Sequence, residues 1–327
     1  MRTVFKLFVV LILALGAWLA WALLLPATPK QQFVLLRPGW SSRHIAQELQ
    51  SAGVIRNANA FLLYHYLNPR SLKAGEYEFV RADGAIGVHE RIVRGDIYTH
   101  TVVIPEGFNI FDIAGAIEQA GLASRAEFLT IASNPSLISD LDPQAKSLEG
   151  YLFPDTYEFT RTQSATDMAS IMVRRFRQEG RALGLTSGPQ LHRIVTMASI
   201  VEKETSAAEE RPLVASVYYN RLEKNIALAA DPCVIYAALL DGRYDGVIRQ
   251  SDLQLDSPYN TYKYPGLPPG PIANPGVASL QAALHPAASN YLYFVSDNHG
   301  HHRFARTLDE HSRNVAAYRR ALSEANR

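Results

Sequence analysis

The sequence predicts an α+β protein: an N-terminal transmembrane helix, then small modules of mixed helix and strand, then a mainly helical α+β domain. Three observations carry this prediction: an uncharged apolar run from Leu7 to Leu25, two similar segments 68 residues apart, and a change of composition near Ser147. The 327 residues are 47 % hydrophobic and 19 % charged, an ordinary globular composition. This length suggests about two domains beyond a targeting segment.

The apolar run predicts a membrane anchor. Its 19 residues would span about 28 Å as a helix, close to the ~30 Å hydrocarbon core of a bilayer. Arg2 and Lys6 precede it, so the positive-inside rule places the N-terminus in the cytoplasm and the rest of the chain outside. A cleaved signal peptide is the alternative, although its apolar region is usually about 7–15 residues long. We therefore expect residues 1–25 to form a cytoplasmic tip and an uncleaved single-pass anchor, followed by a linker over 26–32.

Residues 33–146 are expected to form a repeat region. PGWSSRHIAQELQSAG aligns with EGFNIFDIAGAIEQAG, and Gly39/Gly107 and Gly53/Gly121 are among the identical pairs. Each copy follows a strand-like run and shows apolar residues at helical spacing before a glycine stop. A second amphipathic stretch follows each copy, and the first copy is predicted to close with a strand. The elements predicted here are strands over 33–36, 76–79 and 101–104 and helical stretches at 60–66 and 126–131. Chance similarity is the alternative, because two copies are few.

Residues 147–327 are expected to form one larger domain, in which 12 of the 16 tyrosines lie. A proline- and glycine-rich loop from Gly266 to Gly276 interrupts it, and long ordered loops are often functional. The segment DPCVIYAAL predicts the start of a further helix. Periodicity predicts helices over 165–183, 189–205, 209–224 and 308–322 and a strand over 291–295.

Glu204 is the leading candidate for catalysis. It follows Met197 by seven residues and Ile200 by four, which places it on the apolar face of its helix, whereas Glu202 points elsewhere. Burial on an apolar face should raise the pKa of a carboxyl group, as a general acid requires. The alternative is that Glu204 lies at a solvated helix end or pairs with Arg211.

Two tyrosine-rich motifs offer candidate sugar-binding residues. SPYNTYKYPGLPPGPIANPG contains Tyr259 and Asn260, whose ring and amide suit a saccharide. LEGYLFPDTYEF contains Tyr151 and Asp155, which could line a groove. The alternatives are a structural asparagine turn for the first motif and an edge strand with a proline boundary for the second.

We expect neither a metal nor a cofactor. Five histidines fall within 27 residues, at 285, 299, 301, 302 and 311, but without metal-ligand spacing, and His299–His302 reads as a solvated polar loop. No nucleotide-binding or serine-hydrolase motif is present. The single cysteine, Cys233, excludes an internal disulfide and reads as a small core residue. The 32 basic and 31 acidic side chains balance, so we expect no nucleic-acid partner.

Six ordered motifs resemble the endolytic murein transglycosylase family, whose members are membrane-anchored lytic transglycosylases that cut peptidoglycan glycan strands. The resemblance covers essentially the whole chain, and the family's LysM-like module matches the first repeat copy. It identifies Glu204, the second glutamate of EKET, with the catalytic residue, and it places the family's Tyr-Asn pair on Tyr259 and Asn260. Asp231 joins Tyr151 and Asp155 as a further groove candidate. The motifs are EGYLFPDTY, ASIVEKET, VASVYYNRL, DPCVIYAAL, SPYNTYKYPGLPPGPIANPG and HPAASNYLYFV.

The resemblance implies a reaction that needs one carboxyl group. Glu204 would protonate the bond between MurNAc and GlcNAc and then deprotonate the MurNAc C6 hydroxyl, which closes on C1 and leaves a 1,6-anhydro end. It also implies the cytoplasmic (inner) membrane, a periplasmic catalytic domain, termination of nascent strands and peptidoglycan synthases as partners. Two alternatives stay open: a peptidoglycan-binding scaffold without activity, and a hydrolytic muramidase, which would need a second acidic group.

Overall fold

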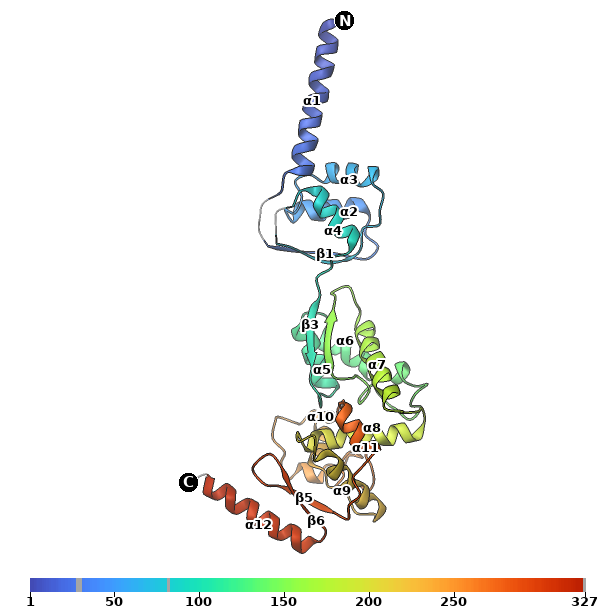
Figure 1. The fold of residues 1–327 in the computed structure, drawn as a ribbon, viewed down its shortest axis with the longest axis vertical. Coiled ribbons are helices and arrows are strands. Elements are labelled where there is room, and N and C mark those ends of the chain that lie inside the picture. The colour runs from blue at the N-terminus through green and yellow to red at the C-terminus, as the bar shows by residue number, and fades with distance from the viewer. Residues whose placement is uncertain (28–30, 81–82, 326–327) are drawn as a thin grey trace. The chain divides into compact units, whose positions relative to one another are not determined.

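The computed structural model describes residues 1–27, 31–80 and 83–325. Residues 28–30 of the expected linker lie outside this description. The first element, α1 (Arg2–Leu24), is a mostly exposed apolar helix (Figure 1). In the described part of the chain it is the one helix long and apolar enough to cross a membrane, the property of an anchor or a signal sequence.

The chain divides into two compact units. The first comprises residues 1–101 and 158–164, and the second comprises 102–157 and 165–327. Most of the second repeat copy is therefore grouped with the long C-terminal helices. The boundary expected after residue 146 grouped that copy with the first one instead.

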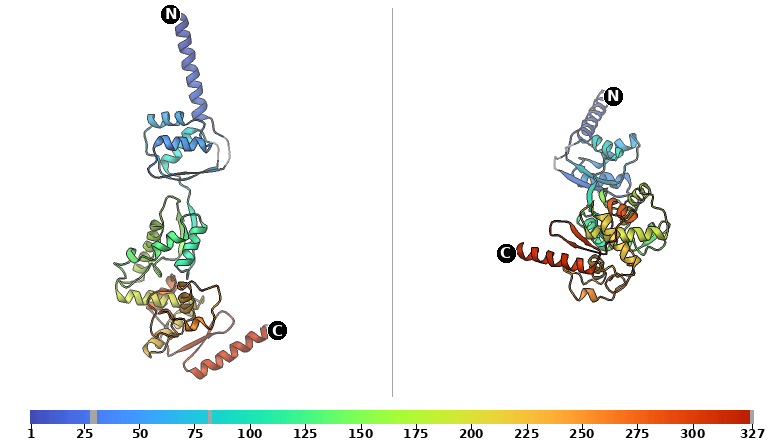
Figure 2. Two further views of the ribbon diagram at one scale, coloured as in Figure 1. Left: turned by 180° about the vertical axis from the view of Figure 1, so that it is seen from behind. Right: turned by 60° about the horizontal axis from the view of Figure 1, so that its bottom comes forward.

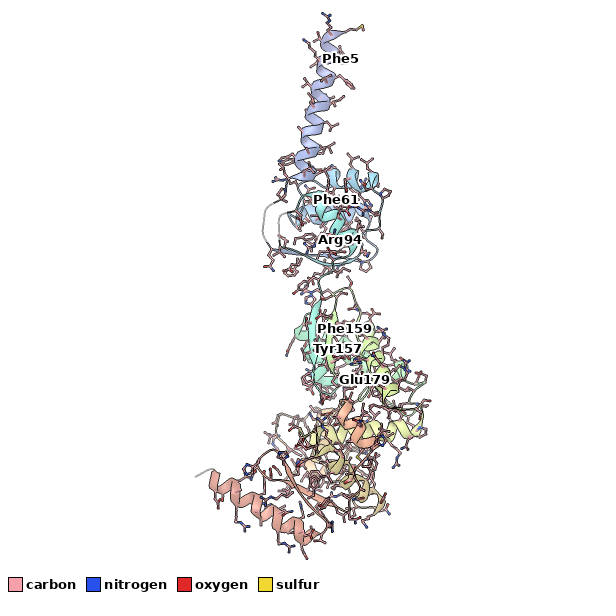
Figure 3. The ribbon with its side chains drawn as sticks, viewed as in Figure 1. Phe5, Phe61, Arg94, Tyr157, Phe159 and Glu179 are labelled. Carbon is pink, nitrogen blue, oxygen red and sulfur yellow. The ribbon has the colours of Figure 1, made fainter. Side chains whose placement is uncertain are left out.

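The first unit is built on an antiparallel pair, β1 (Gln32–Leu36) with β2 (Gly75–Phe79), in which Val34 lies opposite Tyr77. Phe61 lies among the helices of this unit (Figure 3) and is fully buried with Leu36 and Tyr77. Ile45 and Leu49, which follow the helical spacing predicted for the first repeat copy, are buried in the same core. The helices are α2 (Ser42–Ser51), α3 (Ala58–Leu67) and α4 (Ala85–Arg94).

The sequence repeat is confirmed at the level of secondary structure. Strand β3 (His100–Ile104) and helix α5 (Ile110–Gln119) begin and end 68 residues after β1 and α2. The paired glycines adopt the same left-handed conformation, with φ of 83° at Gly39 and 79° at Gly107. A residue with a Cβ would be strained in this conformation, so glycine occupies the equivalent turn in both copies. The second copy continues with α6 (Arg125–Ala132) and β4 (Asp155–Phe159), and β4 pairs with β3.

The second unit is mainly helical, and α8 runs through its centre. The side chains of α8 from residue 194 to residue 201 are all buried, and the helix packs against α9, α10 and α11. A two-stranded antiparallel sheet and a long terminal helix complete the unit, and the helix extends from that sheet in both views (Figures 1 and 2). The elements are α7 (Ala165–Ala182), α8 (Pro189–Glu204), α9 (Arg211–Glu223), α10 (Asp231–Leu240), α11 (Val277–Leu284), β5 (Tyr293–Ser296), β6 (His302–Ala305), α12 (Leu308–Ala325) and the 3-10 turns Pro135–Leu137 and Asp252–Gln254.

The four long predicted helices of this unit are confirmed, with ends that differ by at most three residues. The prediction of a solvated loop over His299–His302 is wrong at its end, because His302 begins β6 and pairs with the partly buried carboxylate of Glu210. Helices α4 and α11 were not predicted. The motif around Asp155 forms the strand β4, as its structural alternative proposed.

Candidate functional site

Glu204 is the last residue of α8, at the point where this buried helix reaches a pocket. The next residue, Thr205, is extended and ends the helix. Glu204 is partly exposed and lines the pocket, whereas Met197 and Ile200 on the same face are fully buried. The sequence prediction that Glu204 shares the apolar face of its helix is confirmed.

The surroundings of Glu204 favour the protonated acid. Burial raises the pKa of its carboxyl group to about 7, and the negative charge of Asp231 adds to this rise. The carboxyl also lies at the C-terminal end of α8, where the helix dipole opposes a further negative charge. The Tyr218 hydroxyl donates a hydrogen bond of 2.5 Å to Oε1, which lowers the pKa in part. At neutral pH the group therefore exists in both protonation states, which suits a residue that donates and then accepts a proton.

The pocket around Glu204 has a volume of about 550 Å³, within the range of about 300–1,000 Å³ typical of ligand sites. Segments far apart in the sequence form it: the ends of α8 and α10, the face of α9, the loop after Asn260, strand β5 and helix α12. The ionisable side chains that line it are those of Glu204, Tyr218, Arg221, Asp231, Tyr262, His311 and Arg319.

Two of these residues are held in place by their own contacts. Arg221 donates to the backbone carbonyls of Leu228 at 2.8 Å and Leu292 at 2.7 Å, so its guanidinium fastens the pocket wall. Asp231 accepts a 2.6 Å hydrogen bond from the Tyr262 hydroxyl. Asp231, predicted from the sequence as a groove residue, is thus a second carboxyl in the pocket of Glu204.

The alternative pairing of Glu204 with Arg211 is wrong. Arg211 donates to Glu202 at 2.8 Å, and the backbone N–H of Gly276 donates to the other oxygen of Glu202 at 2.9 Å. Glu202 therefore ties α8 to the loop before α11, on a different side of the helix from Glu204.

The Tyr-Asn pair lies outside the set of residues that line the Glu204 pocket. Asn260 is fully buried, and its amide donates to the carbonyls of Leu253 and Leu255 at 3.0 and 2.9 Å. Tyr259 packs on Tyr236 with ring centroids 5.1 Å apart, and burial raises its pKa to about 12. In the structure both residues shape the loop that carries Tyr262.

Tyr151 and Asp155 also lie away from Glu204. Tyr151 is fully buried and donates its hydroxyl hydrogen bond to the buried carboxyl of Asp142. Asp155 accepts a 2.6 Å hydrogen bond from Arg175, whose guanidinium keeps the pKa of that carboxyl below its usual range. Tyr151 contributes to the core, and Asp155 joins the start of β4 to α7.

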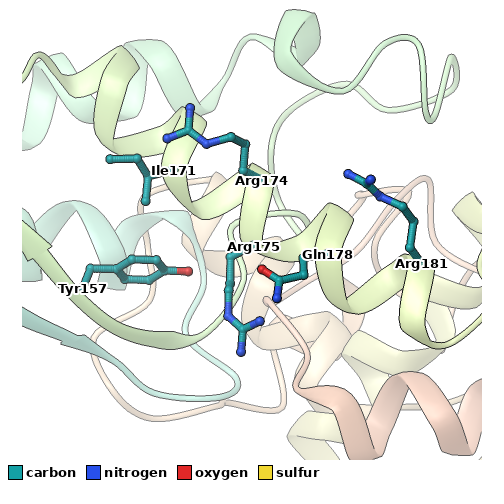
Figure 4. A pocket seen from close by; sticks show the side chains of 6 residues that line it. All are labelled: Tyr157, Ile171, Arg174, Arg175, Gln178 and Arg181. Atoms are coloured by element: carbon teal, nitrogen blue, oxygen red, sulfur yellow. The ribbon is translucent and has the colours of Figure 1, made fainter.

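A second hollow of about 640 Å³ lies along α7. The Tyr157 ring points towards Arg175 and Gln178 (Figure 4). Its other lining residues are Ile171, Arg174 and Arg181, so it offers cations and no acid. It therefore lacks the proton donor that a glycosidase-type reaction needs.

Sequence reasoning missed the buried carboxyl of Glu149, which is 1 % exposed. It accepts hydrogen bonds from the Ile110 N–H at 3.0 Å, the Tyr236 hydroxyl at 2.9 Å and the Asn274 amide at 3.0 Å. Burial raises its pKa to about 8. These contacts join α5, α10 and the proline-rich loop, and the position of Glu149 in the first of the six motifs was the available signal.

The sequence also gave no role to Tyr218 and Arg221, although both lie in the VASVYYNRL motif. The residues of α12 that line the pocket belong to none of the six motifs, although His311 is one of the five histidines noted in the sequence. Among residues 1–27, 31–80 and 83–325, no cluster of three or more His, Cys, Asp or Glu side chains has the arrangement of a metal site. Cys233 is fully buried, and burial raises the pKa of its thiol, in keeping with a core residue.

Comparison with known proteins gives one family. Residues 34–317 match the YceG-like family. A Bacillus subtilis protein named endolytic murein transglycosylase is 33 % identical over 300 residues, covering 86 % of this chain and 82 % of that protein. A Streptococcus pneumoniae protein of the same name is 29 % identical, covering 86 % of this chain and 57 % of that longer protein. The crystal structure of a YceG-like protein from Listeria monocytogenes matches 88 % of this chain and 99 % of that one, with 35 % identity and a TM-score of 0.57.

Proposed function

The chain belongs to the YceG-like family, and on this premise we propose that it is an endolytic lytic transglycosylase that cleaves peptidoglycan glycan strands. The name of its relatives supports this function. The observation that carries it is the carboxyl of Glu204, which lines a pocket and has a pKa raised to about 7.

Glu204 begins the reaction as the acid. Its proton passes to the oxygen that joins MurNAc C1 to GlcNAc, and the C1–O bond breaks with its electron pair on that oxygen. The MurNAc ring gains oxocarbenium character, and Glu204 becomes a carboxylate. The Tyr218 hydroxyl stabilises this carboxylate through the hydrogen bond to Oε1.

The same carboxylate completes the reaction as the base. It takes the proton of the MurNAc C6 hydroxyl, and the hydroxyl oxygen bonds to C1. The products are a GlcNAc end and a 1,6-anhydro-MurNAc end, and Glu204 is protonated again. The reaction consumes no water, so a single carboxyl group is sufficient, whereas most hydrolytic glycosidases need two.

Asp231 supports this reaction electrostatically. Its carboxyl shares the pocket with Glu204, so negative charge there stabilises the positive charge that develops at C1. The same observation favours the alternative of a hydrolytic muramidase, because such an enzyme needs a second carboxyl to activate water and Asp231 is a second carboxyl in this pocket. The chemical nature of the new chain end separates the two reactions.

We propose that the N-terminal helix anchors this activity in the cytoplasmic membrane. Arg2 and Lys6 before the apolar segment favour a cytoplasmic N-terminus and a periplasmic catalytic unit. There the enzyme would cut nascent strands and terminate their growth beside peptidoglycan synthases. We also propose that the first repeat copy is a LysM-like module, which would hold glycan or set the distance from the bilayer.

The test uses the full chain in detergent, incubated with purified glycan strands and compared with Glu204→Gln. We expect anhydro-MurNAc ends from the parent, detected by mass spectrometry, and a loss of about 10²–10⁴-fold in the variant, as for other general acids. Glu223→Gln is the matched control, since Glu223 is an exposed glutamate of α9 outside the pocket. Thermal unfolding of all three proteins checks that each is folded.

Three other results would each change the conclusion. Reducing MurNAc ends from the parent would identify a hydrolase. Strand binding without cleavage would identify a scaffold. Equal activity of Glu204→Gln and the parent would remove Glu204 as the acid, whatever the product.

A further inference from the structure

Helix α12 supplies one wall of the Glu204 pocket. His311, Val315 and Arg319 line the pocket, and their spacing of four residues places them on one side of the helix. The helix packs on β5 and β6, and none of its described residues is fully buried. It therefore covers the pocket without being part of the hydrophobic core, and its inward side chains are available to a ligand.

Most polar groups of the pocket already have partners. The carboxyls of Glu204 and Asp231 accept hydrogen bonds from tyrosine hydroxyls, and the Arg221 guanidinium donates to backbone carbonyls. The His311 ring stacks on Tyr293 at 5.1 Å, and burial lowers its pKa, which disfavours the charged imidazolium. Its buried Nδ1 has no hydrogen-bond partner within the described residues.

Arg319 differs from the other charged side chains of the pocket, Glu204, Asp231 and Arg221. It is exposed, and within the described part of the chain it makes no hydrogen bond and no ion pair. The next residue, Arg320, is also exposed but does not line the pocket. Arg319 is thus a cation directed at the substrate pocket, with its five N–H donors free for an anionic group.

We propose that Arg319 is a substrate-binding residue that holds a carboxylate carried on the lactyl side chain of a MurNAc unit. This inference rests on the proposed function and concerns specificity at the same site. The sugar rings of the glycan carry hydroxyl and acetamido groups, which are uncharged. Carboxylates occur on the side chain at C3 of MurNAc, either in an attached peptide stem or as the free lactyl carboxylate where the stem has been removed.

A guanidinium suits this ligand because its planar fork can donate two parallel hydrogen bonds to one carboxylate. A carboxylate held by Arg319 on α12 would give the MurNAc unit a contact to a second element of the pocket, besides the end of α8 that carries Glu204. The contact would restrict how the ring can lie against Glu204. Arg319 would thereby distinguish MurNAc from GlcNAc, which lacks the lactyl group.

The test compares variants of the protein on glycan strands that differ in their carboxylate groups. The full-length parent and Arg319→Gln are compared on stem-bearing strands, on the same strands with every carboxylate converted to an amide, and on strands stripped of peptide. Arg319→Lys tests whether charge alone restores the contact. Arg320→Gln is the matched control on the same helix. Cleavage is followed as kcat/KM, and strand affinity is measured separately in a Glu204→Gln background.

We expect Arg319→Gln to lower kcat/KM and affinity about three- to tenfold on carboxylate-bearing strands, which is the scale of a partly solvated ion pair. The ratio of parent to variant should fall to about one on amidated strands, and it should shrink as salt is added. An effect confined to stem-bearing strands identifies a stem carboxylate, and one confined to stripped strands identifies the lactyl carboxylate.

Two results would overturn the inference: no effect on any strand, or the same loss on charged and amidated strands in a folded variant. If the proposed function itself fails, the parent forms no anhydro ends on any strand. The affinity comparison still tests Arg319 in that case, so the two failures can be distinguished.

Discussion

The hydrogen bond from Tyr218 to Glu204 makes a quantitative prediction about pH dependence. Tyr218→Phe removes the hydroxyl that donates to Oε1 at 2.5 Å and keeps the ring, which packs edge-on against Phe294 at 5.8 Å. A hydrogen bond to an ionised group contributes about 1.5–3 kcal/mol, and one to a neutral group about 0.5–1.5 kcal/mol. The difference favours the carboxylate by about 1–1.5 kcal/mol, which corresponds to about one pKa unit.

The variant should therefore keep its proton to a higher pH. A general acid must be protonated in the free enzyme, so kcat/KM of the parent should fall as the pH rises through about 7, the pKa of Glu204. In Tyr218→Phe this fall should begin about one pH unit higher. The maximum rate should also drop, because a weaker acid donates its proton less readily.

The assay is the initial rate of anhydro-end formation between about pH 5 and 9, the range around such a transition. Tyr219→Phe is the matched control: Tyr219 lies on the same helix but donates to the Ala283 carbonyl at 2.9 Å and does not line the pocket. Its profile should match that of the parent. If the fall in Tyr218→Phe stays in place or moves to lower pH, the hydrogen bond does not set the acidity of Glu204 and the reasoning fails.

Three further predictions follow from the same unit. Asp231→Asn removes a negative charge that raises the pKa of Glu204, so the fall in kcat/KM should move to lower pH; an upward move would contradict the electrostatic account. Burial raises the pKa of Glu149 from 4.5 to about 8, so the stability that its neutral form provides is fully present below pH 4.5 and is lost as the pH rises to about 8. The free energy of unfolding of the parent should therefore fall by about 1 kcal/mol per pH unit across this window and level off above it, whereas Glu149→Gln should lack this fall in denaturant titrations. Gly150→Ala should lower the melting temperature by at least about 4 °C, because φ there is +89° and the new Cβ would lie 2.5 Å from Pro271; an unchanged melting temperature would count against this packing.

The elements that could be predicted from sequence are those whose pattern is local. Helices α7, α8 and α12 are long enough for their period to be visible, and the glycines of the repeat mark equivalent turns. Helix α11 has eight residues and is mostly apolar, so its sequence lacks the alternation that identifies a helix. Strand β6 begins at His302, in a polar segment whose pairing with β5 is a tertiary contact.

The residues of the candidate site also divide into those that a local sequence pattern identifies and those that only the folded structure brings to the pocket. Glu204 could be identified because its spacing from Met197 and Ile200 fixes the face on which it lies. Tyr259 and Asn260 have residue types that suit a saccharide, but their side-chain contacts depend on how the loop folds. Arg319 could not be found at all, because α12 reaches the pocket only through its packing on the β5–β6 sheet.

A comparison of Glu204 with Glu149 explains why an acid of this kind lies at the end of a helix. Both carboxyls are buried enough for their pKa to rise, to about 7 and about 8. Glu149 accepts three hydrogen bonds from the protein and is 1 % exposed, so its proton cannot reach a substrate. Glu204 accepts one, from Tyr218, and its remaining surface faces the pocket. A carboxyl further inside α8 would be as enclosed as its neighbours, and one beyond Thr205 would leave the helix that buries it. The last turn of a buried helix is where a carboxyl can be desolvated and still meet a ligand.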